Sequence, residues 1–277
     1  MVVIKEFPSR SFESRVDALK ELVTNKKTLI AQKKGIIKEA DAINCYKIDN
    51  GSDVSVSKAE SAAVVKADTD TIIVKAVSNA VNYYDSHGDV SLPSSWNRTA
   101  KNTKNGLHLQ EHEMRFDKII SDEVSFSVEN FTWKELGYNF EGETEALVMT
   151  SKVQKEDNPY MFGKYVRGKV KNHSAGLRYV SISLAINSGE EWAKEEKAVW
   201  DKYYDSIANK EDVDEAGYFW AIHEQKIIET SAVPRGSNPA TPTISVESAD
   251  STSTKEEDSF DDTPRGETKS FINTNFF

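Results

Sequence analysis

The sequence is short of cysteine, of long apolar runs and of positive charge. Cys45 is the one cysteine among 277 residues, so no disulfide can form within the chain and a reducing compartment is expected. No segment approaches the roughly 20 apolar residues that a membrane-spanning helix needs. The N-terminal apolar run is too short for a signal peptide. These features predict a soluble cytoplasmic protein that does not contact a membrane.

The chain carries an excess of acidic residues. Its formal net charge is −10 and its pI is about 5.2. A general nucleic-acid-binding protein would present a basic face, so direct nucleic-acid binding is not expected. The chain is 38% hydrophobic and 29% charged. This composition permits a packed core, and the length suits one large domain or two small ones.

The first part of the chain has the pattern of a long amphipathic helix. Apolar residues recur near helical spacing over residues 12–43, and Ser14 with Asp17 fits a capping box. The opposite face is rich in lysine. A solvated face is the plain interpretation of those lysines. The alternative is a basic arm that docks on an acidic partner.

The middle of the chain is rich in strand patterns. Strands are predicted near residues 71–77, 119–128, 143–153, 177–186, 217–222 and 225–233, and helices near 94–104 and 190–209. The sequence therefore predicts a β-rich α+β protein. It divides into an N-terminal arm (1–44), a linker or edge strand (45–69), a main domain (70–246) and an acidic, disordered tail (247–277).

A polar pair precedes the central strand. Ser174 follows His173, and Gly176 comes two residues after the serine. A serine beside a flexible backbone and in front of a rigid strand suits a nucleophile, because glycine lets the backbone approach a substrate. The same residues are also ordinary turn formers. On this stretch alone, the turn is the favoured interpretation.

Three kinds of site compete. In the first, Ser174 is activated by His112 as general base, with an acidic residue to orient the histidine. In the second, residues 108–112 match H-x-x-E-H, so His108 and His112 would bind zinc if the segment were helical. In the third, none of the five histidines is catalytic, because a histidine is more often a hydrogen-bonded structural residue.

Five short segments follow one another along the chain: residues 85–93 (DSHGDVSLP), 109–113 (LQEHE), 174–177 (SAGL), 228–233 (IETSAV) and 238–240 (NPA). In this order they resemble the segments D-x-x-G-D-V-x-x-P, L-x-x-H-D, S-I-G-F, L-x-E-V-S-L-V and P-A-N-P-x-A of the prohead (capsid maturation) proteases of tailed phages, a family related in fold to the herpesvirus assemblins. The resemblance covers residues 72–246, about two thirds of the chain. Glu113 and Ser237 depart from the family's pattern.

The resemblance implies a role for each site residue. Ser174 would be the nucleophile and His112 the base, and Glu229 would orient the histidine. His173 is the rival third member, because assemblins use a second histidine. Backbone N–H groups near Gly176, helped by Arg178, would form the oxyanion hole. Ser181 and Ser183 are alternative nucleophiles, but neither is followed by glycine two residues later.

The resemblance also implies a fold and a setting. The fold would be a small, mostly antiparallel β-barrel with helices packed outside. The activity would be cleavage of scaffold, or of the scaffolding arm of the major capsid protein, inside the assembling procapsid in the host cytoplasm. No cofactor or metal is implied, and a homo-oligomer is left open. Self-cleavage would trim residues 1–44 and 247–277. The alternatives are an inactive capsid- or portal-associated protein and, more distantly, a zinc hydrolase.

Overall fold

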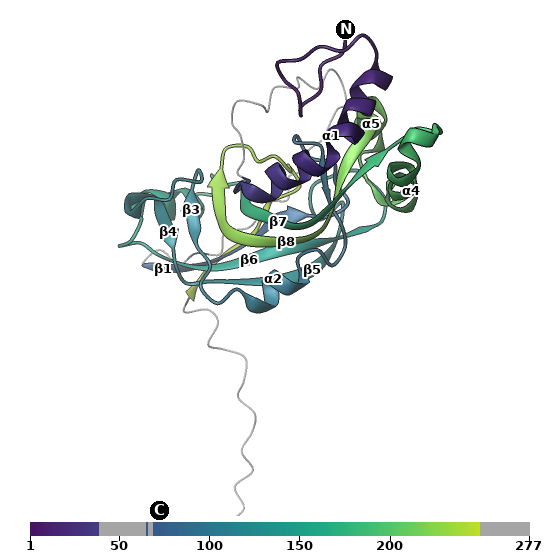
Figure 1. Ribbon diagram of the computed structural model, residues 1–277. Helices are drawn as coiled ribbons and strands as arrows, with labels where there is room; N and C mark the ends of the chain where they lie inside the picture. The colour runs from purple at the N-terminus through teal and green to yellow at the C-terminus, as the bar shows by residue number, and fades with distance from the viewer. Residues whose placement is uncertain (39–64, 66–68, 250–277) are drawn as a thin grey trace, which may run out of the picture.

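The computed structural model describes residues 1–38, 65 and 69–249, which form an α+β protein with two β-sheets and flanking helices (Figure 1). The predicted strand-rich α+β class is confirmed. The helices are α1 (Arg15–Gly35), α2 (Asn97–Asn102), α3 (Pro159–Val166), α4 (Lys194–Tyr203) and α5 (Lys210–Ala216), with short 3-10 turns η1 (Phe116–Lys118), η2 (Glu191–Ala193) and η3 (Tyr204–Ser206). The strands are β1 (Thr71–Ala80), β2 (Asp89–Ser91), β3 (His108–Gln110), β4 (Ile119–Ser121), β5 (Val124–Thr132), β6 (Glu143–Gln154), β7 (Asn172–Ile186), β8 (Tyr218–Val233) and β9 (Thr243–Ser248).

The first sheet has the order β5-β6-β1-β9, and all of its pairs are antiparallel. Its central strands, β1 and β6, are rich in β-branched and apolar residues that the sheet buries. They correspond to the strands predicted at 71–77 and 143–153. The pattern does not predict β9, because the sequence turns polar there. It is a strand because its backbone completes the edge of β1.

The second sheet is built around the long strand β8. β2 and β3 lie parallel to β8, β4 follows β3, and β7 pairs antiparallel with β8. The sequence predicts two strands at 217–222 and 225–233, but β8 is continuous. It remains one strand because β7 pairs with it along nearly its whole length. The other edge of β7, called its free edge below, pairs with no described strand and carries only isolated bridges from Lys38 and Pro242.

The expected closed β-barrel is not formed by the described strands. Their pairings make two separate sheets, and no pairing joins one to the other. β7 shifts register against β8 at three places, and such irregularities bend a strand. Figure 1 shows β7 and β8 as long curved strands. They curve over the first sheet and enclose a shared apolar core, without closing a hydrogen-bonded cylinder.

The same register shifts explain the burial pattern of β7. In the first half, Leu177 and Tyr179 face the core. After the shifts around Ser181, the buried set becomes Ile182, Leu184 and Ile186. One inserted residue exchanges the two faces of a strand, because side chains alternate with a period of two. The sequence pattern predicts a single buried face and misses this exchange.

The N-terminal helix is shorter than the sequence predicts. α1 covers residues 15–35, whereas the pattern predicts a helix over 12–43. Ser14 caps it as predicted, accepting a hydrogen bond from the Asp17 N–H. The helix ends at Gly35, a poor helix former, and the chain is extended at Ile36. Lys38 then forms a backbone bridge with Leu177 on β7.

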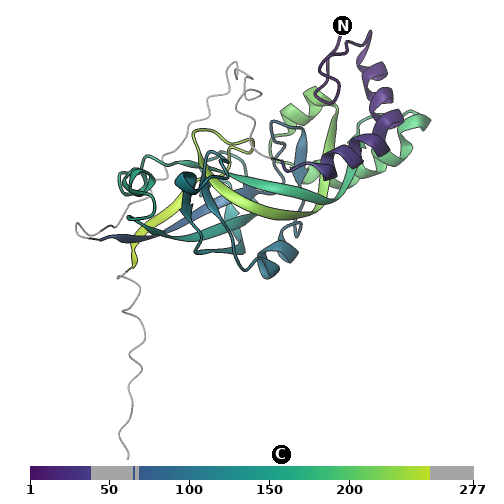
Figure 2. The same ribbon diagram turned by 60° about the vertical axis from the view of Figure 1, so that its left-hand side comes forward.

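The lysine face of α1 docks on acidic residues of its own chain. Lys26 Nζ lies 2.5 Å from the buried Glu196 and 3.0 Å from Glu195. Lys33 Nζ lies 2.9 Å from Asp89. Figure 2 shows α1, in purple, beside the green helices α4 and α5. Lys26 and Lys33 are therefore bound by acidic residues of the same chain, whereas Lys20, Lys27 and Lys34 remain exposed.

The segment predicted as one helix at 190–209 is broken. α4 is flanked by the short turns η2 and η3, and α5 follows separately. The helix predicted at 94–104 corresponds to α2. Most of the predicted linker (45–69) and of the predicted tail (247–277) lies outside the described residues. No helix in the described part of the chain is long and apolar enough to cross a membrane.

Candidate active site

Pairing of β7 with β8 brings the predicted site residues to one face of the second sheet. Ser174 lies directly across from Ser231, and Gly176 lies across from Glu229. Directly opposed residues of an antiparallel pair share a face, with Cβ atoms about 5 Å apart. Residues two apart on one strand also share a face. Ser174, Gly176, Glu229 and Ser231 therefore form one polar patch, although 50 or more residues separate the two halves in sequence.

His112 joins this patch from the turn that follows β3. β3 runs parallel to β8 and ends beside Ala232, and the turn at Glu111 and His112 bends back so that the His112 side chain reaches Glu229. The His112 backbone N–H donates to Ser231 Oγ over 3.0 Å. The imidazole Nδ1 lies 2.6 Å from Glu229 Oε1. The side chains of His112 and Glu229 are 6% and 1% exposed, so this contact is shielded from water.

The backbone that presents His112 is unusual. Glu111 and His112 have φ values of +54° and +61°. The left-handed region costs an ordinary residue roughly 1–2 kcal/mol. The cost is offset by the two hydrogen bonds of His112 to β8. Two consecutive residues held in this conformation indicate that the position of His112 is specified by the fold, a feature that recurs at functional sites.

The hydrogen bonds assign the protons in the cluster. Ser231 Oγ accepts from the His112 N–H, so its own proton is donated to Glu229 Oε2, 2.6 Å away. A carboxylate only accepts, so the His112 Nδ1–H donates to Oε1. A neutral His112 then carries no proton on Nε2. This is the tautomer that a general base needs.

Gly176 is required by the Glu229 side chain rather than by its own backbone conformation. A Cβ at position 176 would overlap the Glu229 carboxylate. The glycine therefore leaves the space in which that carboxylate reaches His112.

The backbone N–H and C=O of Leu177 hydrogen-bond to the backbone of Lys38, at the free edge of β7. By alternation the Gly176 N–H points to β8 and the Ala175 N–H to the free edge, where it is the better placed oxyanion donor.

Ser174 is 4% exposed, and its hydroxyl makes no hydrogen bond with the described residues. It lies on the same strand face as the His112–Glu229 pair. Arg178 is exposed on that face, four residues along β7. That is about 13 Å along a strand, so the guanidinium would have to fold back to assist at Ser174.

His173 lies on the other face of the sheet, with His108. Tyr165 links the two rings, its hydroxyl lying 2.8 Å from His108 Nε2 and 2.9 Å from His173 Nε2. Ser151 Oγ contacts His108 Nδ1, and the Thr241 carbonyl contacts His173 Nδ1. Adjacent strand residues point to opposite faces, so His173 is remote from the His112–Glu229 pair. The structure brings Glu229, and not this rival, to His112.

Every hydrogen bond of the His108–Tyr165–His173 network can be given one donor and one acceptor while both imidazole rings are neutral. The Thr241 carbonyl accepts from His173 Nδ1–H, so His173 Nε2 accepts from Tyr165. The Tyr165 oxygen then accepts from His108 Nε2–H, and His108 Nδ1 accepts from Ser151. Burial lowers the pKa of His173 to about 4 and that of His108 well below its usual range. These histidines are structural.

The zinc arrangement is not formed. Residues 108–110 are a strand and 111–112 belong to a turn, so the segment is not the helix that H-x-x-E-H chemistry requires. His108 and His112 each bond different partners on different faces of the sheet. Among the described residues there is no group of three side chains suited to a metal ion.

A second serine–histidine contact exists elsewhere. Ser183 Oγ lies 2.6 Å from His223 Nε2, between β7 and β8. No described carboxylate bonds the other nitrogen of His223, whose ring instead packs edge-on against Tyr203. The pair therefore lacks the acid that would fix its tautomer. Ser181, the other alternative nucleophile, makes no side-chain hydrogen bond with a described residue.

Sequence reasoning misses two groups of residues. Ser231 is within a quoted motif, but the motif gives no sign that it links His112 to Glu229. Asp85 and Asp89 form a buried cluster with Lys38, and the pattern D-x-x-G-D was the sequence signal that could have indicated it.

Compared with protein-family models, with curated proteins and with solved structures, the chain gives no match in any of the three.

Proposed function

We propose that the chain is a serine endopeptidase of phage head maturation, with Ser174 as nucleophile, His112 as general base and Glu229 as the acid that orients the histidine. The observation that carries the proposal is the buried 2.6 Å contact between His112 and Glu229, on the same sheet face as Ser174. The order of the five sequence motifs supports the phage setting and the kinship with the herpesvirus assemblins.

The reaction would follow from the proton assignment. His112 Nε2 takes the Ser174 proton as Oγ attacks the scissile carbonyl, and the resulting imidazolium is stabilised by Glu229. Backbone N–H groups at the free edge of β7 stabilise the oxyanion. His112 gives the proton to the leaving amine, so an acyl-enzyme remains on Ser174. Water, deprotonated by His112, then releases the acid product and restores the serine.

In this proposal the substrates are the scaffold, the scaffolding arm of the major capsid protein and the enzyme's own flanks, within the assembling procapsid in the host cytoplasm. No cofactor takes part. Residues 1–44 and 247–277 are the flanks expected to be removed. The ordered α1 and β9 set a condition on this trimming, because both belong to the folded body. Removal of residues 1–44 must detach α1 from its acidic docking surface.

The test compares intact masses of the wild type, Ser174→Ala and Ser183→Ala, each purified after co-expression with the major capsid protein. Ser183→Ala is the matched control, because Ser183 also lies on β7 and its hydroxyl contacts a different histidine, His223. We expect trimming in the wild type and in the control, and none in Ser174→Ala. A serine-directed fluorophosphonate should label the wild type and Ser183→Ala but not Ser174→Ala.

Other outcomes point elsewhere. If Ser183→Ala abolishes trimming and Ser174→Ala does not, the nucleophile is on the Ser183–His223 pair. Trimming that survives both substitutions but stops with EDTA would revive the metal hydrolase. If no form cuts itself or the capsid protein and none is labelled, the chain is better explained as an inactive capsid- or portal-associated protein.

A further inference from the structure

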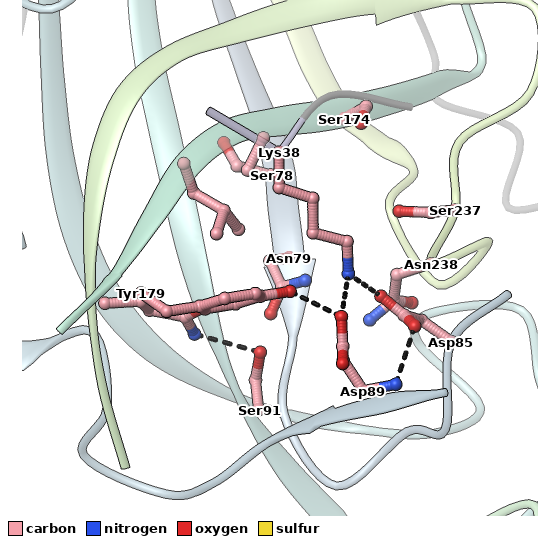
Figure 3. Close-up of a pocket in the computed structure, with 13 residues that line it drawn as sticks. Lys38, Ser78, Asn79, Asp85, Asp89, Ser91, Ser174, Tyr179, Ser237 and Asn238 are labelled. Carbon is pink, nitrogen blue, oxygen red and sulfur yellow. Dashed lines mark hydrogen bonds and ion pairs between the residues drawn. The ribbon is translucent and has the colours of Figure 1, made fainter. Parts of the chain in front are cut away.

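A buried acidic cavity lies under the free edge of β7, close to Ser174. Its lining includes Asp85, Asp89, Tyr179 and Ser174 itself (Figure 3). Tyr179 donates its hydroxyl proton to Asp89 Oδ2 over 2.5 Å. Gln225 also lines the cavity, and its buried Oε1 accepts no hydrogen bond from a described residue. The cavity thus offers two carboxylates and an unused acceptor to a group rich in N–H donors.

Lys38 occupies this cavity. Its Nζ lies 2.6 Å from Asp85 Oδ2 and 2.6 Å from Asp89 Oδ2, and Lys33 contributes a second ammonium 2.9 Å from Asp89 Oδ1. Burial disfavours the charge of Lys38, but the two carboxylates outweigh it and raise its pKa. The ammonium groups likewise hold the pKa of Asp89 below its usual range, against the effect of burial. Without Lys38, two carboxylates would face one ammonium.

The backbone of Lys38 binds β7 as an added strand would. Its N–H donates to the Leu177 carbonyl over 2.8 Å, and its carbonyl accepts from the Leu177 N–H over 3.0 Å. The bridge is antiparallel, so a chain in this position runs along β7 towards Ser174. The next free-edge groups in that direction belong to Ala175. Strand addition to a free sheet edge is a recurrent mode of peptide recognition.

We infer that this cavity is a substrate subsite for a lysine or arginine side chain, and that Lys38 fills it as a built-in competitor. The inference rests on the proposed function. A bound peptide would pair with Leu177 and then with Ala175, which brings its backbone to Ser174. The basic residue would therefore lie about three residues before the scissile bond. A guanidinium, with five N–H donors, could also satisfy Gln225.

The first experiment measures cleavage preference. The full chain is incubated with proteome peptides produced by a glutamate-specific protease, which leaves lysine and arginine internal. New ends are identified by mass spectrometry, and those also produced by Ser174→Ala are subtracted. We expect lysine and arginine to be enriched at one position about three residues before the cleaved bond. Asp85→Asn, which keeps the shape of the side chain but removes one charge, should reduce that enrichment.

The second experiment tests the competitor. Lys38→Met should raise the Ser174-dependent cleavage rate at low peptide concentration by about tenfold, because a tethered competitor acts at a high effective concentration. Lys26→Met is the matched control. Lys26 also anchors α1 to the body, through Glu196 and Glu195, but does not line the cavity. Its rate should stay within about twofold of the wild type, since the cavity stays filled.

The two proposals fail in different ways. If Ser174-dependent cleavage occurs without a basic preference, or if Lys38→Met and Lys26→Met change the rate equally, the subsite is wrong and the protease stands. If neither the wild type nor Lys38→Met cleaves anything that Ser174→Ala leaves intact, the proposed function fails and the subsite with it.

Discussion

The two faces of the β7–β8 ladder carry histidines in opposite situations. On one face His112 contacts a buried carboxylate, and Ser174 lies on the same strand surface. On the other face His108 and His173 share one tyrosine hydroxyl, and neither bonds a carboxylate of the described part of the chain. The residues involved are neighbours in sequence, since His173 immediately precedes Ser174. The period-two alternation of a strand separates them completely.

The two histidine environments differ in their hydrogen-bond partners. A carboxylate lies against Nδ1 of His112 and fixes the orientation and tautomer of its ring. The other pair has no such partner, and burial lowers both pKa values. Protonation of either ring would place a proton on the nitrogen that accepts a hydrogen bond from Tyr165 or Ser151, so that hydrogen bond would be lost. Adjacency of a histidine and a serine in the sequence therefore does not show that the two side chains act together.

The largest effect on cleavage is expected when His112 on the first face is replaced and the His108–Tyr165–His173 network on the second face is kept. His112→Gln should reduce Ser174-dependent cleavage by about 10⁴-fold, because no base remains to take the serine proton. His173→Gln should instead lower the unfolding temperature, because it disrupts a buried hydrogen-bond network. Its rate per folded molecule should stay within about threefold of the wild type. Cleavage kinetics and thermal unfolding of both variants measure the contrast.

Two results would contradict this contrast between the two faces. If His173→Gln lost activity while its folded fraction and its circular dichroism spectrum stayed normal, the second face would take part in the chemistry. If His112→Gln kept its rate, the base would have to be another residue. The Ser183–His223 pair would then be examined first, through His223→Gln.

Local patterns predicted most of the elements, because strand and helix periodicities are local properties of the sequence. The strands at 71–77 and 143–153 and the cap of α1 are examples. The patterns failed where long-range pairing decides the outcome. β9 is a strand because β1 accepts it, β8 is continuous because β7 supports it, and the face exchange of β7 arises from its register against β8.

The site shows the same division. Motif order gave Ser174, His112 and Glu229, but could not choose between Glu229 and His173. That choice depends on which strand face each residue occupies, which follows from the pairing of β7 with β8. The role of Gly176 was also out of reach. The sequence suggests an oxyanion donor, and only the fold shows the Glu229 carboxylate lying against it.

A smaller effect should come from weakening the acid. Glu229→Gln keeps the shape of the side chain, but its amide nitrogen can face His112 and favour the tautomer with a proton on Nε2. We expect cleavage to fall by about 10³-fold, with the folded structure retained. Glu224→Gln is the matched control on the same strand, because Glu224 pairs with the exposed Arg98. Equal losses in both variants would remove the special role of Glu229.

The buried histidines of the second face, His173 and His108, should make the free energy of unfolding depend on pH. The folded pKa of His173 is about 4, lowered from 6.5, so the unfolded chain binds a proton between these values that the folded chain excludes. The free energy of unfolding should therefore be fully present above pH 6.5 and fall as the pH drops towards 4. The loss from His173 is on the order of 3 kcal/mol, and His108 adds to it.

Urea unfolding at pH 4, 5, 6 and 7 measures this slope. His173→Gln should be less stable at pH 7 yet show a flatter profile, because one excluded proton has been removed. His223→Gln is the control. His223 is only half-buried, so its replacement should leave most of the slope in place. A wild-type free energy that stays level from pH 6.5 to 4 would mean that His108 and His173 accept protons in the folded state. The network would then be able to carry a charge, and the contrast between the two faces would be lost.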